Sequence, residues 1–400
     1  MVRFFILLAL SIATLCTNGQ KMPENYYRAQ AALQHKNYIL AQQQIDSAII
    51  ASKRNPYILV KKGEILFTQN DFKQALYSFE EANKIRSNIA SLWEAKAYAM
   101  LNNTVAAIEA LERHLSSAPR VSEAKIILDT AFLQLANTPQ WKTFWLNEWY
   151  NSNELLEAEV EYHFSQNEWE LALDLLNQKM DGKKSRHQFY ALRGKAYSAV
   201  GSYKAAEADF AHALKRSKRN DEYMANYGRA LDRVGKHKKA IKLFNDAILR
   251  SGGNPDYFMH RAKAYLNQHD FENAFTDINH YLSYYPSSID ALSLKANIAT
   301  QMGRNIDALF CLRKLIELEP SSWKHYAARA ELYLSSKNWE VAKIDLNRAI
   351  ELNLNDQKLY LLRGKCRNNL GERSQACTDW KKAVKLGSFE AQELIYKNCR

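Results

Sequence analysis

Glycine and proline are scarce in this chain of 400 residues, which contains 13 of the first and 7 of the second. Ordinary proteins contain about 7% glycine and about 5% proline. A β-sheet protein with many strands needs turn residues about every ten positions, so this composition disfavours it. Hydrophobic residues at 47% and charged residues at 24% are values typical of a folded protein. Together these figures predict an all-helical protein.

Sequence patterns of common enzymes are also absent. The chain has no HExxH, no GxSxG and no phosphate-binding glycine loop. It has no CxxC pair and its ten histidines are scattered, which disfavours a metal site. No nucleic-acid reader motif is present either. We therefore expect no catalytic residue, no cofactor, no metal and no nucleic-acid partner.

The first residues have the pattern of an export signal. Residues 1–3 end in a basic residue, residues 4–15 are almost all apolar, and small residues follow up to Gly19. This order predicts a signal peptide over residues 1–19. A membrane-spanning helix needs about 20 apolar residues, so an anchor is the weaker interpretation, and Leu15 before Cys16 disfavours a lipoprotein. We expect an exported protein, periplasmic or extracellular, with no membrane span after cleavage.

An alanine recurs every 34 residues in the second half of the chain, at Ala172, Ala206, Ala240, Ala274, Ala308, Ala342 and Ala376. Twelve residues before it stands a second, mostly small residue, such as Gly194, and four residues after it stands a large apolar one, such as Phe210. Two small residues let antiparallel helices approach closely, and the large residue fills the space between them. Each unit of 34 residues is therefore predicted to be a helical hairpin.

This pattern resembles the tetratricopeptide repeat (TPR), most plainly in LRGKAYSAVGSYKAAEADFAHAL from Leu192 and HRAKAYLNQHDFENAFTDI from His260. The resemblance implies an α-solenoid, a right-handed superhelix of TPR hairpins. One hairpin cannot bury its apolar faces alone, so we expect a single continuous stack. The predicted order is N-terminal TPR units at 22–121, a degenerate tryptophan-rich unit at 122–152, seven regular units at 153–390 and a short capping helix at 391–400.

The degenerate unit contains Trp141, Trp145 and Trp149 at a spacing of four residues. In a helix such residues share one face. We interpret the stripe as core packing. An exposed docking surface is the alternative, because the unit departs from the repeat.

Arginine and aspartate recur together, 16 residues apart, at the same two positions of four units. The pairs are Arg193 with Asp209, Arg261 with Asp277, Arg329 with Asp345, and Arg363 with Asp379. A catalytic acid and base would not be repeated four times. We predict ion pairs that tie the first helix of a hairpin to its second and help to fix register.

Four cysteines follow the predicted signal peptide. The segment from Ala376 resembles the closing unit of exported bacterial TPR proteins, in which two cysteines bridge the last hairpin to a capping helix, and this resemblance implies a disulfide between Cys377 and Cys399. Hairpin geometry offers Cys366 with Cys377 as a competing pair, and spacing alone does not choose between them. Free apolar thiols are a third interpretation, to which Cys311 is expected to belong.

In the TPR family the first helices line the ligand groove, at positions that include the one after the small residue. Here that position holds Lys195, Arg229, Lys263 and Asn297 in successive units. Three adjacent cations would pair with an extended acidic peptide. The set of Lys, Asn and Arg with which some family members grip the C-terminal carboxylate of chaperones is not found.

Basic residues also cluster in two predicted turns, at Lys215, Arg216, Lys218, Arg219, Lys236, Lys238 and Lys239. A solvated edge explains such clusters, and binding of an anionic polymer or an acidic partner is the alternative. The sequence thus favours a non-enzymatic exported scaffold that binds another protein or peptide, within a cell-envelope assembly. The alternative function is binding of an anionic envelope polysaccharide through this basic edge.

Overall fold

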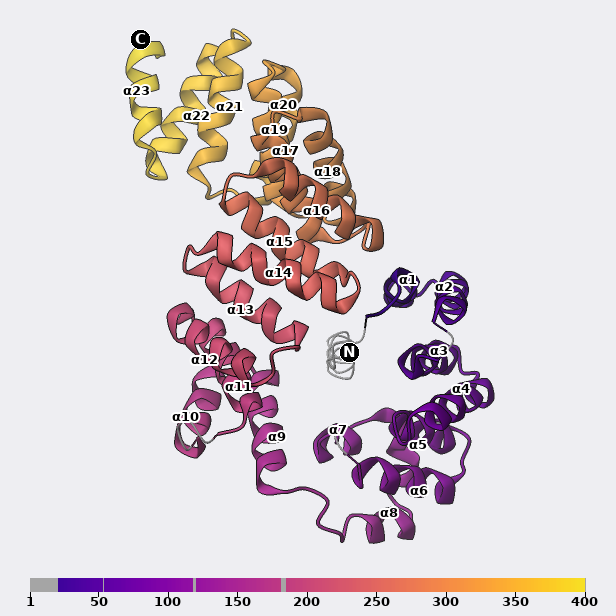
Figure 1. The fold of residues 1–400 in the computed structure, drawn as a ribbon. Helices are drawn as coiled ribbons and strands as arrows, with labels where there is room; N and C mark the ends of the chain where they lie inside the picture. Colours follow the sequence, from indigo (N-terminus) through magenta and orange to yellow (C-terminus); the bar gives the residue numbers. More distant parts are fainter. Residues whose placement is uncertain (1–20, 53, 118–119, 181–184, 400) are drawn as a thin grey trace. The chain divides into compact units, whose positions relative to one another are not determined.

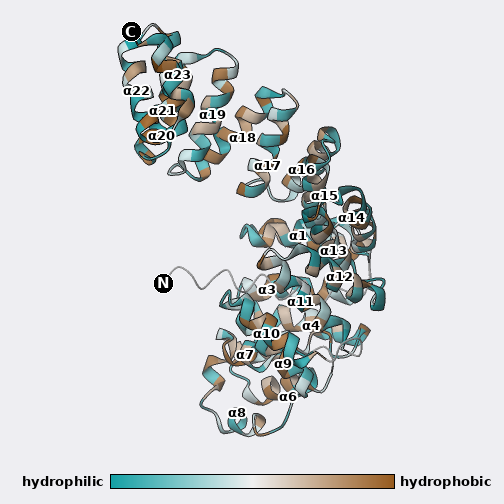
Figure 2. Cartoon of the chain, turned by 90° about the vertical axis from the view of Figure 1, so that its left-hand side faces the viewer, coloured by the Kyte–Doolittle hydropathy of each residue, from teal (hydrophilic) through white to brown (hydrophobic). Residues whose placement is uncertain are grey.

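The computed structural model describes residues 21–399 except 53, 118–119 and 181–184. The predicted signal peptide lies outside the described residues. Within them no β-strand occurs, and consecutive helices pack against each other as hairpins along the chain (Figure 1). Hydrophobic and hydrophilic segments alternate along these helices (Figure 2), as expected where each helix buries one side. The predicted all-α solenoid of helical hairpins is confirmed.

The N-terminal hairpins pair α1 (Glu24–Gln34) with α2 (Tyr38–Ala51), α3 (Pro56–Thr68) with α4 (Phe72–Ile85), and α5 (Ser91–Met100) with α6 (Thr104–Leu115). After an irregular segment come α9 (Ser152–Ser165) with α10 (Trp169–Lys179), α11 (His187–Ala199) with α12 (Tyr203–Arg216), and α13 (Asp221–Arg233) with α14 (His237–Ser251). Helices α15 (Pro255–Asn267) and α16 (Phe271–Tyr284) follow in the sequence. The chain ends with α17 (Ile289–Gln301) and α18 (Asn305–Leu318), α19 (Trp323–Ser335) and α20 (Trp339–Leu352), α21 (Gln357–Asn369) and α22 (Arg373–Lys385), and α23 (Phe389–Asn398).

The turn inside each hairpin is short and follows one local rule. One residue adopts a left-handed backbone, for example Asn70 at φ 63° or Gly201 at φ 79°. Asparagine tolerates this conformation better than most residues do. The next helix is then often capped by a side chain, as where the Asp71 carboxylate accepts the backbone N–H of Gln74. A single residue per turn therefore suffices, and few glycines are needed.

The size of the small residue in the first helix is matched to its partner in the second. Glycine faces an aromatic ring in four hairpins, at Gly63 with Phe79, Gly194 with Phe210, Gly228 with Phe244 and Gly364 with Trp380. A Cβ at these glycines would lie 2.2 to 2.9 Å from a ring atom, closer than side chains pack. Where the second helix carries Ile278, Leu312 or Leu346 instead, the first carries alanine. The predicted close approach of the two helices is thus built from complementary volumes.

The segment 122–152 does not form the helical hairpin expected for a degenerate repeat. It folds as α7 (Glu123–Ile127), a 3-10 turn η2 (Thr130–Leu135) and α8 (Pro139–Phe144). The predicted helical stripe of tryptophans is wrong, because α8 ends before Trp145 and the Trp149 indole N–H donates to the Phe144 carbonyl at 2.9 Å. The interpretation as core packing agrees with the structure, since Trp141 is buried and both other indoles pack on the same core cluster.

The described chain divides into two compact units, residues 1–264 (unit 1) and 265–400 (unit 2), where the sequence predicts one continuous stack. A contact far along the sequence closes unit 1. The Met22 backbone N–H donates to the Ser251 carbonyl at 3.0 Å, and the Tyr27 hydroxyl donates to the same oxygen at 2.7 Å. Repeat arrays normally connect neighbours only, whereas this contact ties the first residues of unit 1 to the end of α14.

Arginine–aspartate pairs join the two helices of a hairpin. The structure places Arg193 at 2.8 Å from Asp209, Arg329 at 2.7 Å from Asp345 and Arg363 at 2.7 Å from Asp379. Arg261 and Asp277 fall on opposite sides of the unit boundary, and their pair stays a prediction. The arginine also reaches back to an asparagine of the preceding hairpin, from Arg193 to Asn177 at 3.0 Å, Arg261 to Asn245 at 2.6 Å and Arg363 to Asn347 at 2.9 Å. One side chain therefore links three helices.

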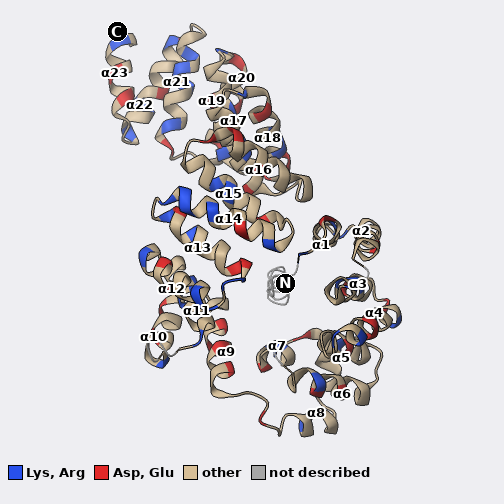
Figure 3. Cartoon of the chain, in the orientation of Figure 1, with Lys and Arg blue, Asp and Glu red and all other residues tan. Residues whose placement is uncertain are grey.

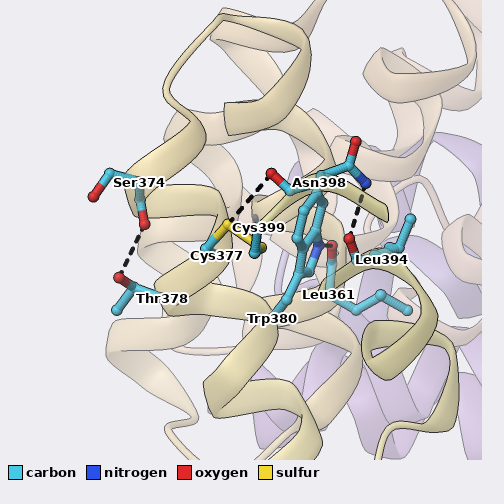
Figure 4. The surroundings of a disulfide bond; sticks show 8 residues. All are labelled: Leu361, Ser374, Cys377, Thr378, Trp380, Leu394, Asn398 and Cys399. Carbon is cyan, nitrogen blue, oxygen red and sulfur yellow. Dashed lines mark hydrogen bonds between the residues drawn. A yellow bond between two sulfur atoms is a disulfide. The ribbon is translucent and has the colours of Figure 1, made fainter. Parts of the chain in front are cut away.

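The last hairpin is joined to α23 by a disulfide between Cys377 and Cys399 (Figure 4), while Cys311 and Cys366 are buried free thiols. The competing pair of Cys366 with Cys377 is not formed. Burial raises the pKa of the Cys366 thiol to about 11, which keeps it protonated and unreactive. Trp380 lies beside the disulfide and donates its indole N–H to the Leu361 carbonyl at 3.3 Å.

Candidate ligand face of the first helices

The first helices of unit 1 line its inner face. Consecutive first helices, α9 with α11 and α11 with α13, pack more closely on each other than consecutive second helices do. The charge on this part of the chain is uneven, with acidic residues on α9 and basic residues prominent on α14 and α15, while α13 carries both signs (Figure 3). The candidate groove residues Lys195, Arg229 and Lys263 lie on α11, α13 and α15.

Lys195 does not belong to a free row of cations. Its ammonium lies 2.8 Å from the Glu222 carboxylate on the next first helix, α13. The same arrangement recurs in unit 2, where Lys365 on α21 lies 2.5 Å from Glu390 on α23. These pairs bridge neighbouring first helices, so the expected ladder of three available cations is reduced to two.

Arg229 and Lys263 are both exposed, and no carboxylate partner is found for either among the described residues. The polar contact of Arg229 is a long hydrogen bond of 3.3 Å to the Asn226 carboxamide oxygen. The surrounding protein, as the larger cause, and the nearby Arg233 both lower the pKa of Arg229. Neither cause is an acidic neighbour, so none compensates the positive charge.

Two further residues lie beside this pair of cations. His260, on α15, is half-buried against Phe244, and burial together with Arg229 and Lys263 lowers its pKa to about 3. Asn226 is 8% exposed, and its amide nitrogen has no hydrogen-bond partner in the described part of the chain. A buried amide without an acceptor costs about 1–3 kcal/mol. Within the described part of the chain the Asn226 amide nitrogen thus lacks an acceptor, and Arg229 has only the Asn226 oxygen as its hydrogen-bond partner.

Asn297, the fourth candidate groove residue, is exposed on α17 in unit 2. Since Asn297 belongs to unit 2, it is not counted among the residues of the candidate face of unit 1.

The predicted basic edge separates into two clusters. Lys215 and Arg216 end α12 and Lys218 and Arg219 follow it, whereas Lys236, Lys238 and Lys239 lie at the start of α14. Helix α13, 13 residues long, runs between the clusters and places them about 20 Å apart. Arg216 donates to the Ser185 carbonyl and Lys236 pairs with Glu207 at 2.7 Å. The seven side chains do not form one continuous edge.

Asn226, His260 and Glu222 were not among the residues singled out from the sequence. Asn226 stands three residues before Arg229 and Glu222 seven before it, so helical periodicity places Glu222, Asn226 and Arg229 on one face of α13. That spacing is the signal that could have identified Asn226 and Glu222. The orientation of the Asn226 amide depends on packing and has no counterpart in the sequence.

Among the described residues no group of three or more potential ligands could hold a metal ion. No helix there combines the length and hydropathy needed to cross a bilayer.

Comparison with known proteins supports the repeat assignment. Tetratricopeptide repeat family models match residues 192–257 and 289–322. Human tetratricopeptide repeat protein 13 is 28% identical over 120 residues, which are 29% of this chain and 14% of that protein. The TPR repeat-containing thioredoxin TDX of Arabidopsis thaliana is 36% identical over 92 residues, 23% of this chain and 24% of that protein. This chain thus spans less than a quarter of the length of these relatives.

The fold is also found among solved structures. The C-terminal part of a TPR repeat-containing protein from Cytophaga hutchinsonii has a TM-score of 0.50 at 16% identity, over 59% of this chain and 98% of that one. At such identity the likeness concerns the fold alone. Stacked helical repeats present extended surfaces that act as scaffolds for protein–protein interaction. The 34-residue period, the hairpin geometry and the two matched segments thus support tetratricopeptide repeats in this chain, with family models matching residues 192–257 and 289–322.

Proposed function

We propose that this chain is an exported, non-enzymatic scaffold that holds another protein or a peptide against the first helices α11, α13 and α15 of unit 1. The observation that carries the proposal is the exposure of Arg229 and Lys263. They occupy equivalent positions on successive first helices. Neither of them has a carboxylate partner among the described residues. Uncompensated charges on a preorganised surface favour a partner of opposite charge.

The scaffold needs little rearrangement to bind. Arg193 and its equivalents fix each hairpin to the one before it, so the spacing between first helices is set before a ligand arrives. A surface that is already ordered saves the entropy of ordering on the protein side.

Export rests on the order of basic, apolar and small residues before Gly19. Met22, three residues after the expected cleavage site, is buried and hydrogen-bonded to Ser251. Cleavage after Gly19 would leave these contacts intact. The disulfide at the C-terminal end suits an oxidising compartment. N-terminal sequencing of the protein purified from its native cells tests this part: a chain that still begins at Met1 contradicts export by cleavage.

Site-directed photo-crosslinking in the native cell tests the binding face. The photoreactive residue p-benzoylphenylalanine replaces Lys263 on the first helix α15, and in a matched control it replaces Lys242, an exposed lysine on the second helix α14. We expect a discrete crosslinked protein with position 263 and none with position 242. Equal crosslinking at both positions, or none at either, contradicts the proposed face.

A further inference from the structure

The hairpin of α13 and α14 lacks the arginine that links three helices in other hairpins. Arg193 and Arg363 each pair with an aspartate 16 residues later and donate to an asparagine 16 residues earlier. In α13, α14 and the helix before them, the three equivalent positions hold Tyr227, Leu243 and Ala211. The arginine, the aspartate and the asparagine are therefore replaced together, and the polar link between the three helices is lost.

Two of these positions, Ala211 and Tyr227, line a cavity of about 370 Å³ between α12 and α13. Ala208 of α12 and Val234, in the turn that follows α13, complete the apolar part of its lining. Methyl groups and one aromatic ring thus surround a space that opens where the polar link is missing. Ligand pockets measure about 300–1,000 Å³, so a cavity at the lower end of this range accommodates one large side chain.

Charged residues around the cavity leave an excess of positive charge. Glu207 lines the cavity and is engaged by Lys236, whose ammonium lies 2.7 Å from its carboxylate. Lys204 also lines the cavity, is exposed and has no carboxylate partner among the described residues. Lys238 occupies the equivalent position of the next second helix, α14, and is exposed and unpaired in the same described part of the chain. Lysines without an acidic partner favour a ligand that carries negative charge beside its apolar group.

We propose that this cavity binds the side chain of one aromatic residue of a partner peptide, and that an acidic residue stands next to it in that peptide. The aromatic ring packs against the Tyr227 ring, because two aromatic rings attract each other edge to face. The neighbouring carboxylate pairs with the Lys204 ammonium. The inference goes beyond the proposed function, since the cavity lies at the second helix α12 and is lined by neither Arg229 nor Lys263.

Methyl NMR of the full chain, with isotope-labelled alanine and valine, observes the lining residues Ala208, Ala211 and Val234 directly. The probe is acetyl-Gly-Asp-Phe-Asp-Gly-amide. Three matched peptides carry Ala in place of Phe, Leu in place of Phe, or Asn in place of both Asp residues. We expect saturable shifts of the three methyl signals with the probe. Binding of the Ala peptide should be at least tenfold weaker, and the Leu and Asn peptides should also bind more weakly than the probe.

Each matched peptide tests one part of the proposal. Equal affinity for the Phe and Ala peptides overturns the cavity as a binding site. Equal affinity for the Leu peptide overturns the choice of an aromatic ring, and equal affinity for the Asn peptide overturns the acidic neighbour.

Two variants close the cavity in different ways. Ala208→Phe fills it from an exposed position of α12, and we expect loss of probe binding with an unchanged Tm. The triple variant Ala211→Asn, Tyr227→Arg and Leu243→Asp restores the polar link of the other hairpins, and it should also lose the binding.

Thr276→Phe is the matched control for Ala208→Phe. It places the same ring at the equivalent exposed position of another second helix, α16, and should bind the probe as the unchanged protein does. Retained binding in a folded Ala208→Phe or triple variant contradicts the site, and so does an equal loss in Thr276→Phe.

Discussion

Volume is matched residue by residue where the two helices of a hairpin touch. Gly63 lies against the Phe79 ring, and a Cβ there would come within 2.2 Å of a ring carbon. Alanine occupies the same position where the partner is the smaller Ile278 or Leu312. Interiors packed this tightly respond to one added methyl group. The match therefore predicts that the two positions are energetically coupled.

The Gly63→Ala change should destabilise the protein by about 1–3 kcal/mol because the new methyl overlaps the Phe79 ring. Phe79→Leu alone should also destabilise it, since it leaves a cavity. The double variant recreates the alanine–leucine pair of other hairpins, so we expect it to be more stable than the sum of the single effects allows. Urea denaturation of all four proteins measures this coupling. Additive effects would contradict it.

His114 provides a residue-scale prediction about pH. It is buried, and its Nε2 accepts the Val121 backbone N–H at 3.1 Å, so the ring is neutral. Burial, Lys96 and Arg120 lower its pKa from 6.5 to about 4. Because the unfolded chain takes up a proton near pH 6.5 and the folded chain does not, stability is lost as the pH falls from 6.5 to 4. This difference in pKa between the unfolded and the folded chain corresponds to about 3 kcal/mol of unfolding free energy.

His114→Gln retains an acceptor for Val121 and removes the titration. Calorimetric Tm values between pH 7 and 4 should therefore fall less steeply in this variant than in the unchanged protein, although His260 still contributes. His212→Gln changes an exposed histidine on α12 and serves as the control that keeps the original profile. An identical pH dependence in His114→Gln would refute the assigned role.

At the scale of helices and hairpins, the arginine–aspartate pairs differ in how well the acid is supported. Asp209 is 5% exposed and has Arg193 as its cation. Asp379 is 2% exposed and has two cations, Arg363 and Arg367, each at 2.7 Å. Removing one partner of a buried pair leaves an uncompensated charge. The loss should therefore be larger in the hairpin with one arginine.

Arg193→Met should destabilise the protein by about 3 kcal/mol, and Arg363→Met by clearly less because Arg367 still neutralises Asp379. Adding Asp209→Leu to Arg193→Met removes the buried charge and should restore most of the stability. Thermal unfolding of the three variants checks this order. Equal losses in Arg193→Met and Arg363→Met would show that the second arginine does not substitute for the first.

The disulfide gives a prediction confined to the last elements. It closes a loop of 22 residues between α22 and the end of α23, and a cross-link of this length contributes about 3 kcal/mol. Replacing Cys377 and Cys399 by serine should increase hydrogen exchange in α23 strongly. Exchange in α11–α14 should stay the same, because repeats contact only their neighbours. Unchanged protection of α23 would contradict the role of the bond.

Regular hairpins could be predicted from the sequence because their 34-residue period is itself the consequence of stacking. The segment 122–152 could not, because it lacks the spaced small residues, and Pro139 begins a new short helix within it. At the candidate site, the positions of Arg229 and Lys263 follow from the period. The partner of Lys195 does not, since Glu222 stands 27 residues away, outside the repeat register. Nor does the unpartnered Asn226 amide, which depends on the rotation of one side chain.

At the scale of the molecule, unit 1 is closed by contact of its first residues with the corner after α14. Gly252 there has φ 81°, and a Cβ would lie 2.3 Å from the Met22 carbonyl oxygen. Its neighbour Gly253 has φ 99° with nothing within 4 Å of the Cβ position. Alanine at either position is strained by the left-handed backbone. Only alanine at position 252 would also displace the N-terminal segment.

Gly252→Ala should therefore increase hydrogen exchange in α1 and at the Met22 amide, because the segment can no longer reach Ser251. Gly253→Ala carries the backbone strain without the clash and should leave α1 protected. Mass spectrometry of exchanged peptides from residues 22–34 distinguishes the two. Similar exchange in both variants would assign the effect to strain and not to the closing contact.

An array whose members touch only their neighbours melts from its ends, and its loss of structure spreads over a broad range of temperature or denaturant. Joining the first hairpin to Ser251, at the end of α14, removes one such end from residues 21–264. That stretch should consequently lose its order in a single sharp transition, and shortening it by even one hairpin should broaden the transition out of proportion to the residues removed.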